Sequence, residues 1–95
     1  MILLYFWLNS PELAIERVAT RVSEGGHNVP EEVIRRRYAK GIKNLFELFI
    51  PLSDFWSIHD NSSTPRRNVA FGFADKREVI KDEKLFNQIK HYGND

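Results

Sequence analysis

Residues 16–44 read ERVATRVSEGGHNVPEEVIRRRYAKGIKN, and this stretch decides how the rest of the chain is organised. It holds two segments with helical patterning, joined by a loop that opens with two glycines and ends with a proline. Glycine commonly ends a helix and proline commonly begins one, so the loop marks both boundaries. Seven Arg or Lys side chains fall within the stretch. Such a density of like charge indicates a region that meets an anion.

Two helices are predicted on either side of this loop. The first runs from Pro11 to Glu24, with Ser10 as its N-cap. The second runs from Pro30 to about Phe49 or Ile50, because Pro51 cannot continue it. In both, apolar residues recur at helical spacing and predict one buried face.

The strands lie outside these helices. The run Ile2–Leu8 is apolar without alternation, which predicts a strand covered on both faces, as in a parallel sheet. Phe55–His59 predicts a second strand, and the long crossover between the two favours parallel pairing. The remaining predicted elements are a hairpin of Asn68–Phe73 with Glu78–Ile80 and a last helix, Glu83–Tyr92, capped by Asp82. The expected fold class is therefore α/β, with two parallel strands joined by a two-helix region, then a β-hairpin and a C-terminal helix.

Length and composition limit the possibilities further. The 95 residues form a single domain, residues 1–95, and the net charge of +1 provides no overall field for nucleic acid or a membrane. Cysteine is absent, which favours a reducing, cytoplasmic location. The opening MILLYFWL is far shorter than the roughly 20 residues that span a bilayer. No membrane partner is expected.

The candidate anion ligands cluster around the glycine loop. Arg17 and Arg21 are one turn apart on one edge of the first helix, and guanidinium groups bind phosphate oxygens in a bidentate way. The alternative is a solvated basic face, but the hinge at Gly25 and Gly26 favours a mobile anion-binding lid. His27 either donates to an anion or satisfies a loop carbonyl. No metal site is expected, because the three histidines are far apart in sequence.

The second helix carries its own basic residues. Arg35 lies on the flank of the core face, so its guanidinium is expected to be held by a partner. Arg36, Lys40 and Lys43 point to solvent. This run invites a nucleic-acid interpretation, but its members spread around the helix and no nucleic-acid partner is expected. The chain contains no Gly-rich phosphate loop followed by Lys and Ser or Thr.

These residues resemble a known family. The segments SPELAIERVA, RV-x-x-GGH-x-VPEEVIRRR, KNLF and DNS, in this order, are similar to the C-terminal half of zeta-toxin-like ATPases and kinases, which have a P-loop kinase fold. The resemblance covers about Leu4 to Arg67. It implies part of a three-layer kinase-like fold that lacks the phosphate-binding loop and the catalytic acid.

The resemblance also implies roles for individual residues. Arg17 matches an arginine of the lid that closes over the triphosphate. The second lid arginine of typical members falls near His27, which is a departure, and Arg21 or Arg35 supplies the charge in its place. Asn44 matches an asparagine of the long helix. Asn61 lies where the nucleotide base approaches.

The leading expectation is thus the lid-bearing portion of an ATP-dependent phosphotransferase. In a complete member ATP and Mg²⁺ are the cofactors, and the acceptor is a nucleotide sugar, UDP-N-acetylglucosamine in typical members, or another small molecule. The resemblance implies a toxin of a toxin–antitoxin pair, and the isolated chain is expected to be inactive. The alternative is a non-enzymatic interaction module that forms a homo-oligomer through an open sheet edge.

Overall fold

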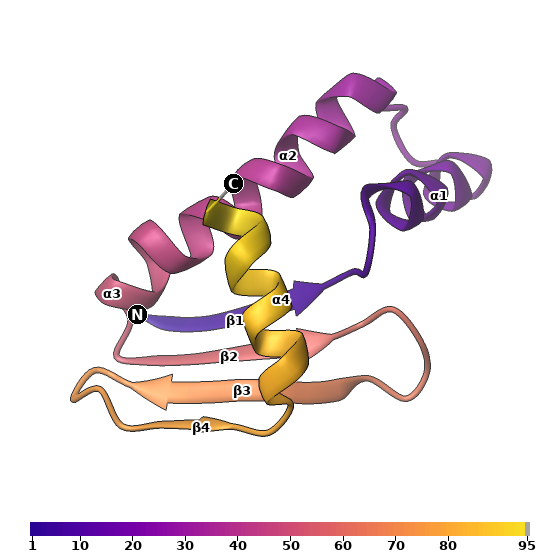
Figure 1. Ribbon diagram of the computed structural model, residues 1–95. Coiled ribbons are helices and arrows are strands. Elements are labelled where there is room, and N and C mark those ends of the chain that lie inside the picture. The colour runs from indigo at the N-terminus through magenta and orange to yellow at the C-terminus, as the bar shows by residue number, and fades with distance from the viewer. Residues whose placement is uncertain (95) are drawn as a thin grey trace.

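A single four-stranded sheet, in the order β1-β2-β3-β4, organises the molecule. The computed structural model describes residues 1–94 (Figure 1). Along the chain the elements are β1 (Ile2–Trp7), α1 (Pro11–Ser23), α2 (Glu31–Asn44), a π-helical turn η1 (Leu45–Phe49), α3 (Ile50–Leu52), β2 (Phe55–Asp60), β3 (Arg67–Phe73), β4 (Glu78–Ile80) and α4 (Glu83–Asn94). The expected mixed α/β class and the order of its elements are confirmed.

Two of the three strand pairings were predicted, namely the parallel pair β1 and β2 and the hairpin of β3 and β4. β1 and β2 are parallel, with Ile2 opposite Phe55 and Trp7 opposite Asp60. β2 and β3 are antiparallel, as are β3 and β4. The register between β2 and β3 shifts after Ile58, because Ala70 pairs with Ile58 and Asn68 pairs with the next residue. Val69 is therefore an extra residue, and this bulge lets Val69 and Ala70 both be buried.

The first helix begins as its sequence predicts. The side chain of Ser10 accepts a hydrogen bond of 3.1 Å from the amide of Leu13, which satisfies one free amide of the first turn. However, none of the residues of α1 is fully buried. The helix packs on α2 and stands away from the sheet, beyond the end of β1 (Figure 1).

The second helix is longer than predicted. It passes through η1 and α3 to Leu52, so the expectation that Pro51 ends it is wrong. Within the π-helical turn the amide of Ile50 donates to the carbonyl of Leu45, five residues back. Proline has no amide hydrogen and clashes with the carbonyl four residues earlier. The wider π turn directly before Pro51 accommodates that clash.

The core lies between the helices and one face of the sheet. α4 crosses this face in front of the strands (Figure 1). The buried hydrophobic residues that form the core cluster are Trp7, Ile42, Leu45, Trp56, Ile58, Val69, Ala70, Phe86 and Ile89. On β3, a Cβ at Gly72 would lie only 2.5 Å from the indole nitrogen of Trp56, so this position admits glycine alone without a shift of the indole.

The other face of the sheet has no helical cover. Ile2, Leu4 and Phe6 are 73%, 55% and 44% exposed. The expectation that β1 is covered on both faces is therefore wrong. α1 packs against α2, while α2 and α4 lie together on the opposite face. Residues 1–94 thus form two layers, and the three layers of the expected kinase-like fold are not present among them. None of the helices in this range combines the length and apolar character needed to cross a membrane.

Candidate functional site

The carboxyl ends of the two parallel strands meet in a loop held by hydrogen bonds. The amide of Asn61 donates to the carbonyl of Trp7 at 2.8 Å, and the amide of Ser62 donates to the carboxylate of Asp60 at 3.0 Å. The Ser62 hydroxyl accepts from the amide of Asn9 at 2.9 Å. Open α/β sheets bind their ligands at the carboxyl ends of the strands. This edge is therefore the first place to look for a site.

Arg17 reaches this edge from α1. Its Nη2 donates to the carbonyl oxygen of Asn61 at 3.1 Å, with a longer contact of 3.5 Å to that of Ser62. The structure thus brings together Arg17 and Asn61, two of the residues that the sequence singled out. Both contacts use one nitrogen of the guanidinium, so its remaining N–H groups are left to meet an anion.

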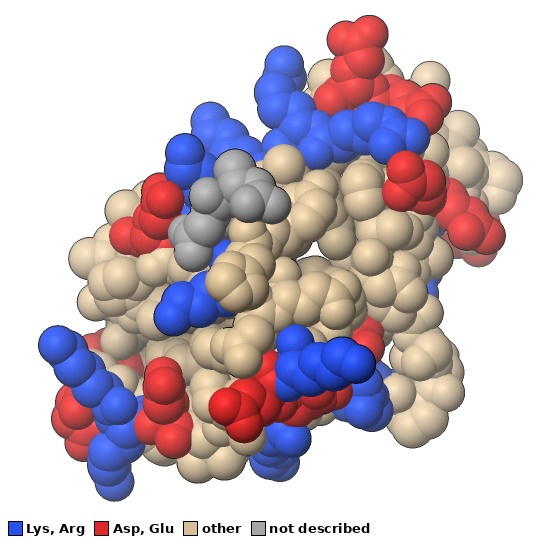
Figure 2. Space-filling view, viewed as in Figure 1, with Lys and Arg blue, Asp and Glu red and all other residues tan. Residues whose placement is uncertain are grey.

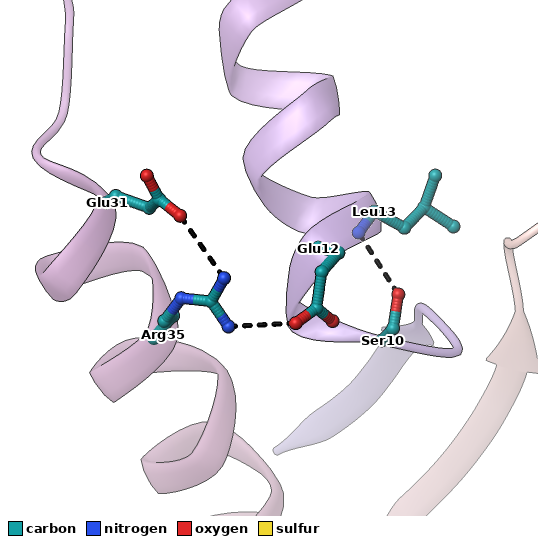
Figure 3. A network of polar contacts seen from close by, with 5 residues as sticks. All are labelled: Ser10, Glu12, Leu13, Glu31 and Arg35. Atoms are coloured by element: carbon teal, nitrogen blue, oxygen red, sulfur yellow. Dashed lines mark hydrogen bonds and ion pairs between the residues drawn. The ribbon is translucent and has the colours of Figure 1, made fainter.

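Arg35 has partners of its own. It donates to Glu12 at 2.9 Å and to Glu31 at 3.2 Å, which joins α1 to α2 (Figure 3). The hydrogen bond from Arg35 holds the pKa of Glu12 below its usual value. The expectation that Arg35 is held by a partner is confirmed. The partners are carboxylates of the protein, so this guanidinium ties the two helices together.

A cleft of about 320 Å³ lies between α1 and α2. Its apolar lining includes Val18 and Ile34, and the guanidinium groups of Arg21 and Arg37 line the same cleft. Among the side chains that the structure describes, no carboxylate forms an ion pair with either arginine. Sequence reasoning passed over Arg37. It directly precedes the core residue Tyr38, and this position beside the buried face could have identified it.

His27 and Asn44 lie apart from the carboxyl edge. His27 is exposed in the loop between α1 and α2. Asn44 lines a pocket of about 580 Å³ together with Arg36, Lys40 and Lys43. It is nine residues beyond Arg35, which corresponds to about 14 Å along a helix. Among the described residues, no hydrogen bond joins His27 or Asn44 to the pair formed by Arg17 and Asn61.

Figure 2 shows the charge on the helical side of the molecule. Lys and Arg side chains gather along α2, at the upper edge of the view, with acidic side chains beside them. Arg36, Lys40 and Lys43 are exposed, as the sequence predicts. Mixed signs on a helix surface are typical of a solvated face.

Another cleft, with a polar lining, lies near the carboxyl ends of the parallel strands, beside Trp7 and Asn9, and has a volume of about 310 Å³. Arg67 lies between two carboxylates there, 3.6 Å from Asp60 and 3.5 Å from Asp82. Neither acid is therefore an unpaired charge. The arrangement offers hydrogen-bonding groups for a polar ligand at the end of β2.

A polar cluster on the uncovered sheet face was missed in the sequence. Ser57 Oγ and His59 Nε2 are 2.8 Å apart, and the amide nitrogen of Asn68 donates to Ser57 Oγ at 2.9 Å. Partial burial lowers the pKa of His59, and the nearby Arg66 lowers it further. The Oδ1 atom of Asn68 is buried without a hydrogen-bond partner. The alternation of Ser57 and His59 along one strand is the signal that places them on one face.

Metal binding and known relatives add no further assignment. Among residues 1–94, no three His, Asp or Glu side chains are placed to hold a metal ion together. Comparisons of the chain with protein-family models, with curated proteins and with solved structures found no match. Function is therefore inferred from the geometry of this chain and from the resemblance of its motifs.

Proposed function

We propose that this chain is the lid-bearing C-terminal portion of a zeta-toxin-like, ATP-dependent kinase with a P-loop kinase-like fold. The observation that carries the proposal is the position of α1 and α2. They form an insertion between two parallel strands, and Arg17 anchors that insertion on the loop that follows the second strand. A lid that closes over a substrate is a segment of this kind, positioned beside the ligand-binding edge of a more rigid sheet.

Arg17 and Arg21 have the charge-neutralising roles in this proposal. Arg17 is held at the carboxyl edge by its Nη2, and Arg21 lines a cleft in which it has no acidic partner among the described side chains. An arginine that neutralises a transferring phosphoryl group is worth roughly 10³–10⁵ in rate. Arg35 has a positioning role, since it ties α1 to α2. The phosphoryl acceptor is a nucleotide sugar or another small molecule, and the proposal includes the toxin role.

The residues present fit the phosphates of ATP but not its Mg²⁺. Arg21 and Arg37 line one cleft and would bind an anion there. The described part of the chain has no acidic cluster to hold a divalent cation. No catalytic step is therefore assigned to metal ligands of this chain. The isolated chain is expected to bind ATP weakly and not to hydrolyse it.

Nuclear magnetic resonance with inorganic tripolyphosphate and with ATP would test the proposal. We expect both to shift the signals of Arg17, Arg21 and Asn61, and Arg21→Ala to weaken the effect. Arg36→Ala is the matched control, because that arginine is exposed on the solvated side of α2. Equal shifts at Lys40 and Lys43 would favour non-specific attraction. Hydrolysis of ATP by the isolated chain, abolished by Arg17→Ala, would contradict the expected inactivity.

A self-associating interaction module is the second candidate, and the edge of β1 favours it. β1 is an edge strand of six residues, and ILLYFW contains no charge and no proline. The opposite edge strand, β4, has three residues and is followed by Lys81. Proteins protect exposed edges with charges, prolines and short strands. A homo-oligomer formed by β1 pairing would give twice the monomer mass in light scattering, and a monomer at high concentration would contradict it.

A further inference from the structure

The uncovered face of the sheet, which we call the open face, carries a continuous set of large side chains. The strand register places the members on one side of the sheet: Ile2, Leu4, Phe6, Phe55, Ser57, His59, Asn68, Phe71, Phe73 and Val79. Seven of these ten are hydrophobic, and none is acidic or basic apart from the histidine. Contiguous exposed apolar surfaces of this kind mark interaction sites.

The polar residues at the centre of the open face bind one another. Asn68 donates to Ser57 Oγ and also to the carbonyls of Ile58 and Ala70. Ser57 is only 5% exposed. Of the buried polar atoms of Ser57, His59 and Asn68, only Oδ1 of Asn68 lacks a hydrogen-bond partner. The surface that an approaching molecule meets is therefore mainly aromatic and aliphatic.

Three cations lie over the aromatic rings of this face. The guanidinium carbon of Arg66 is 4.8 Å from the ring centre of Phe6, and that of Arg77 is 5.0 Å from the ring centre of Phe73. The ammonium group of Lys81 is 5.8 Å from the ring centre of Phe71. Among the described side chains, no carboxylate forms an ion pair with Arg66 or Lys81.

We propose that the open face binds an amphipathic α-helix of a partner polypeptide, with acidic residues on both sides of its apolar stripe. The sheet is mixed, with one parallel and two antiparallel strand pairs, and a packed helix is a common cover for an apolar sheet face of this kind. Arg77 is paired with Asp75 at 2.6 Å, so the charge of the partner is inferred from Arg66 and Lys81. Each of these two cations lies over a ring of the apolar surface, where an acidic residue beside the partner's apolar stripe would meet it. The inference does not rest on the proposed kinase function.

Charge argues against a second copy on this face. Two open faces in contact would gather Arg66 and Lys81 of both chains at one interface, and none of the ten side chains of the face is an acid that could pair with them. Pairing at the β1 edge would extend the sheet and leave the open face as bare as before. Single-stranded nucleic acid would stack on the four phenylalanines alone, whereas an apolar helix stripe would also cover Ile2, Leu4 and Val79, which provide no ring for a base.

The test uses synthetic peptides of roughly 18 residues, five helical turns, with a leucine stripe. One peptide carries glutamate beside the stripe, and a matched peptide carries lysine. We expect saturable one-to-one binding of the glutamate peptide in fluorescence anisotropy, at least about tenfold tighter than the lysine peptide. The double variant Arg66→Glu, Lys81→Glu is expected to reverse this preference.

Variants of the apolar residues separate this face from other exposed hydrophobic groups. Leu4→Ser with Phe6→Ser is expected to abolish binding, whereas Leu48→Ser with Leu52→Ser is expected to leave it unchanged. The control residues have similar exposure, 47% and 65%, but lie in η1 and α3. Circular dichroism confirms that each variant is folded.

Four results would overturn the proposal. The first is equal binding of both peptides, and the second is binding that survives Leu4→Ser with Phe6→Ser in folded protein. The third is preferential binding to vesicles of anionic phospholipid or to oligothymidylate. The fourth is a dimer, detected by light scattering, that no longer forms when Leu4 and Phe6 are both replaced by serine.

Discussion

Arg17 and Asn61 are 44 residues apart in sequence, and Nη2 of Arg17 donates a hydrogen bond of 3.1 Å to the carbonyl oxygen of Asn61. This contact joins α1 to the loop that follows β2. α1 packs mainly on α2, so this side chain is a direct link between the helix and the carboxyl edge.

Replacement of Arg17 tests that link. Arg17→Ala is expected to lower the free energy of unfolding by about 0.5–1.5 kcal/mol, the usual worth of a partly buried hydrogen bond. Urea denaturation followed by tryptophan fluorescence measures this change, and hydrogen exchange at Asn61 and Ser62 should become faster. Arg36→Ala, on the solvated face of α2, serves as the control. Unchanged exchange in Arg17→Ala would show that the loop holds its shape without the arginine.

Gly72 is expected to be the most sensitive glycine of the sheet. Its substitution by alanine would place Cβ within 2.5–2.7 Å of the indole of Trp56, so the indole must move. Overpacking of this kind costs about 1–3 kcal/mol of folding free energy. Thermal and urea unfolding of Gly72→Ala would measure the loss.

Gly41→Ala is the matched control for this substitution. Gly41 lies within α2, and the nearest atom to its added Cβ is the hydroxyl of Tyr5 at 3.6 Å, an ordinary contact. Alanine in a helix interior is more stable than glycine by about 0.5–1 kcal/mol. The two substitutions should therefore have opposite signs. Equal stability of Gly72→Ala and the unsubstituted protein would mean that the Trp56 ring has room to turn.

The lowered pKa of His59 predicts that the folded protein loses stability in mild acid. Burial lowers its pKa below the ordinary value of about 6.5, so the folded protein binds this proton less readily than the unfolded chain. Stability rises with pH where the unfolded chain binds more protons. The contribution is therefore present above pH 6.5 and is lost as the pH falls below it, towards the lowered pKa of the folded state.

Unfolding free energies measured between pH 5 and pH 8 check this sign. His59→Gln is expected to reduce the dependence of the unfolding free energy on pH, whereas His27→Gln, in the exposed loop, should leave that dependence unchanged. A slope that persists in His59→Gln would assign the pH dependence to other groups.

The ion pair between Glu12 and Arg35 is expected to restrain α1. Glu12→Gln removes one of the two carboxylates that hold the guanidinium, and both partners are largely exposed, so the effect should diminish in high salt. Relaxation measurements on the α1 amides would detect the added motion. Glu16→Gln, an exposed glutamate on the same helix, is the control. Identical dynamics in the two variants would show that packing on α2 alone positions α1.

Much of the fold was predictable because its signals are local. Ser10 before Pro11 placed the start of α1, and the two glycines placed its end. The strands at Phe55 and Asn68 were predicted to within one residue at each end. Pro51 led to a wrong prediction of the helix end, because no pattern in the residues before it indicates the π-helical turn that accommodates it.

The candidate site was less predictable because its contacts are long-range. The sequence identified Arg17, Arg21 and Arg35 as a group, but it did not show that Arg35 meets Glu12, 23 residues away. Nor did it pair Arg21 with Arg37 in one cleft. Helical spacing reports the side of a helix on which a residue lies. It does not report which element faces that side.

The sequence by itself determined the kind and order of the elements, since caps, prolines and apolar periodicity act within a few residues. The tertiary structure alone decided which sheet face is covered and which arginines are free. The run Ile2–Trp7 is apolar on both sides, yet α2 and α4 both pack on one side and leave Ile2, Leu4 and Phe6 exposed. The physical reason is that cover and charge pairing depend on where distant helices lie, and no short stretch of sequence records that position.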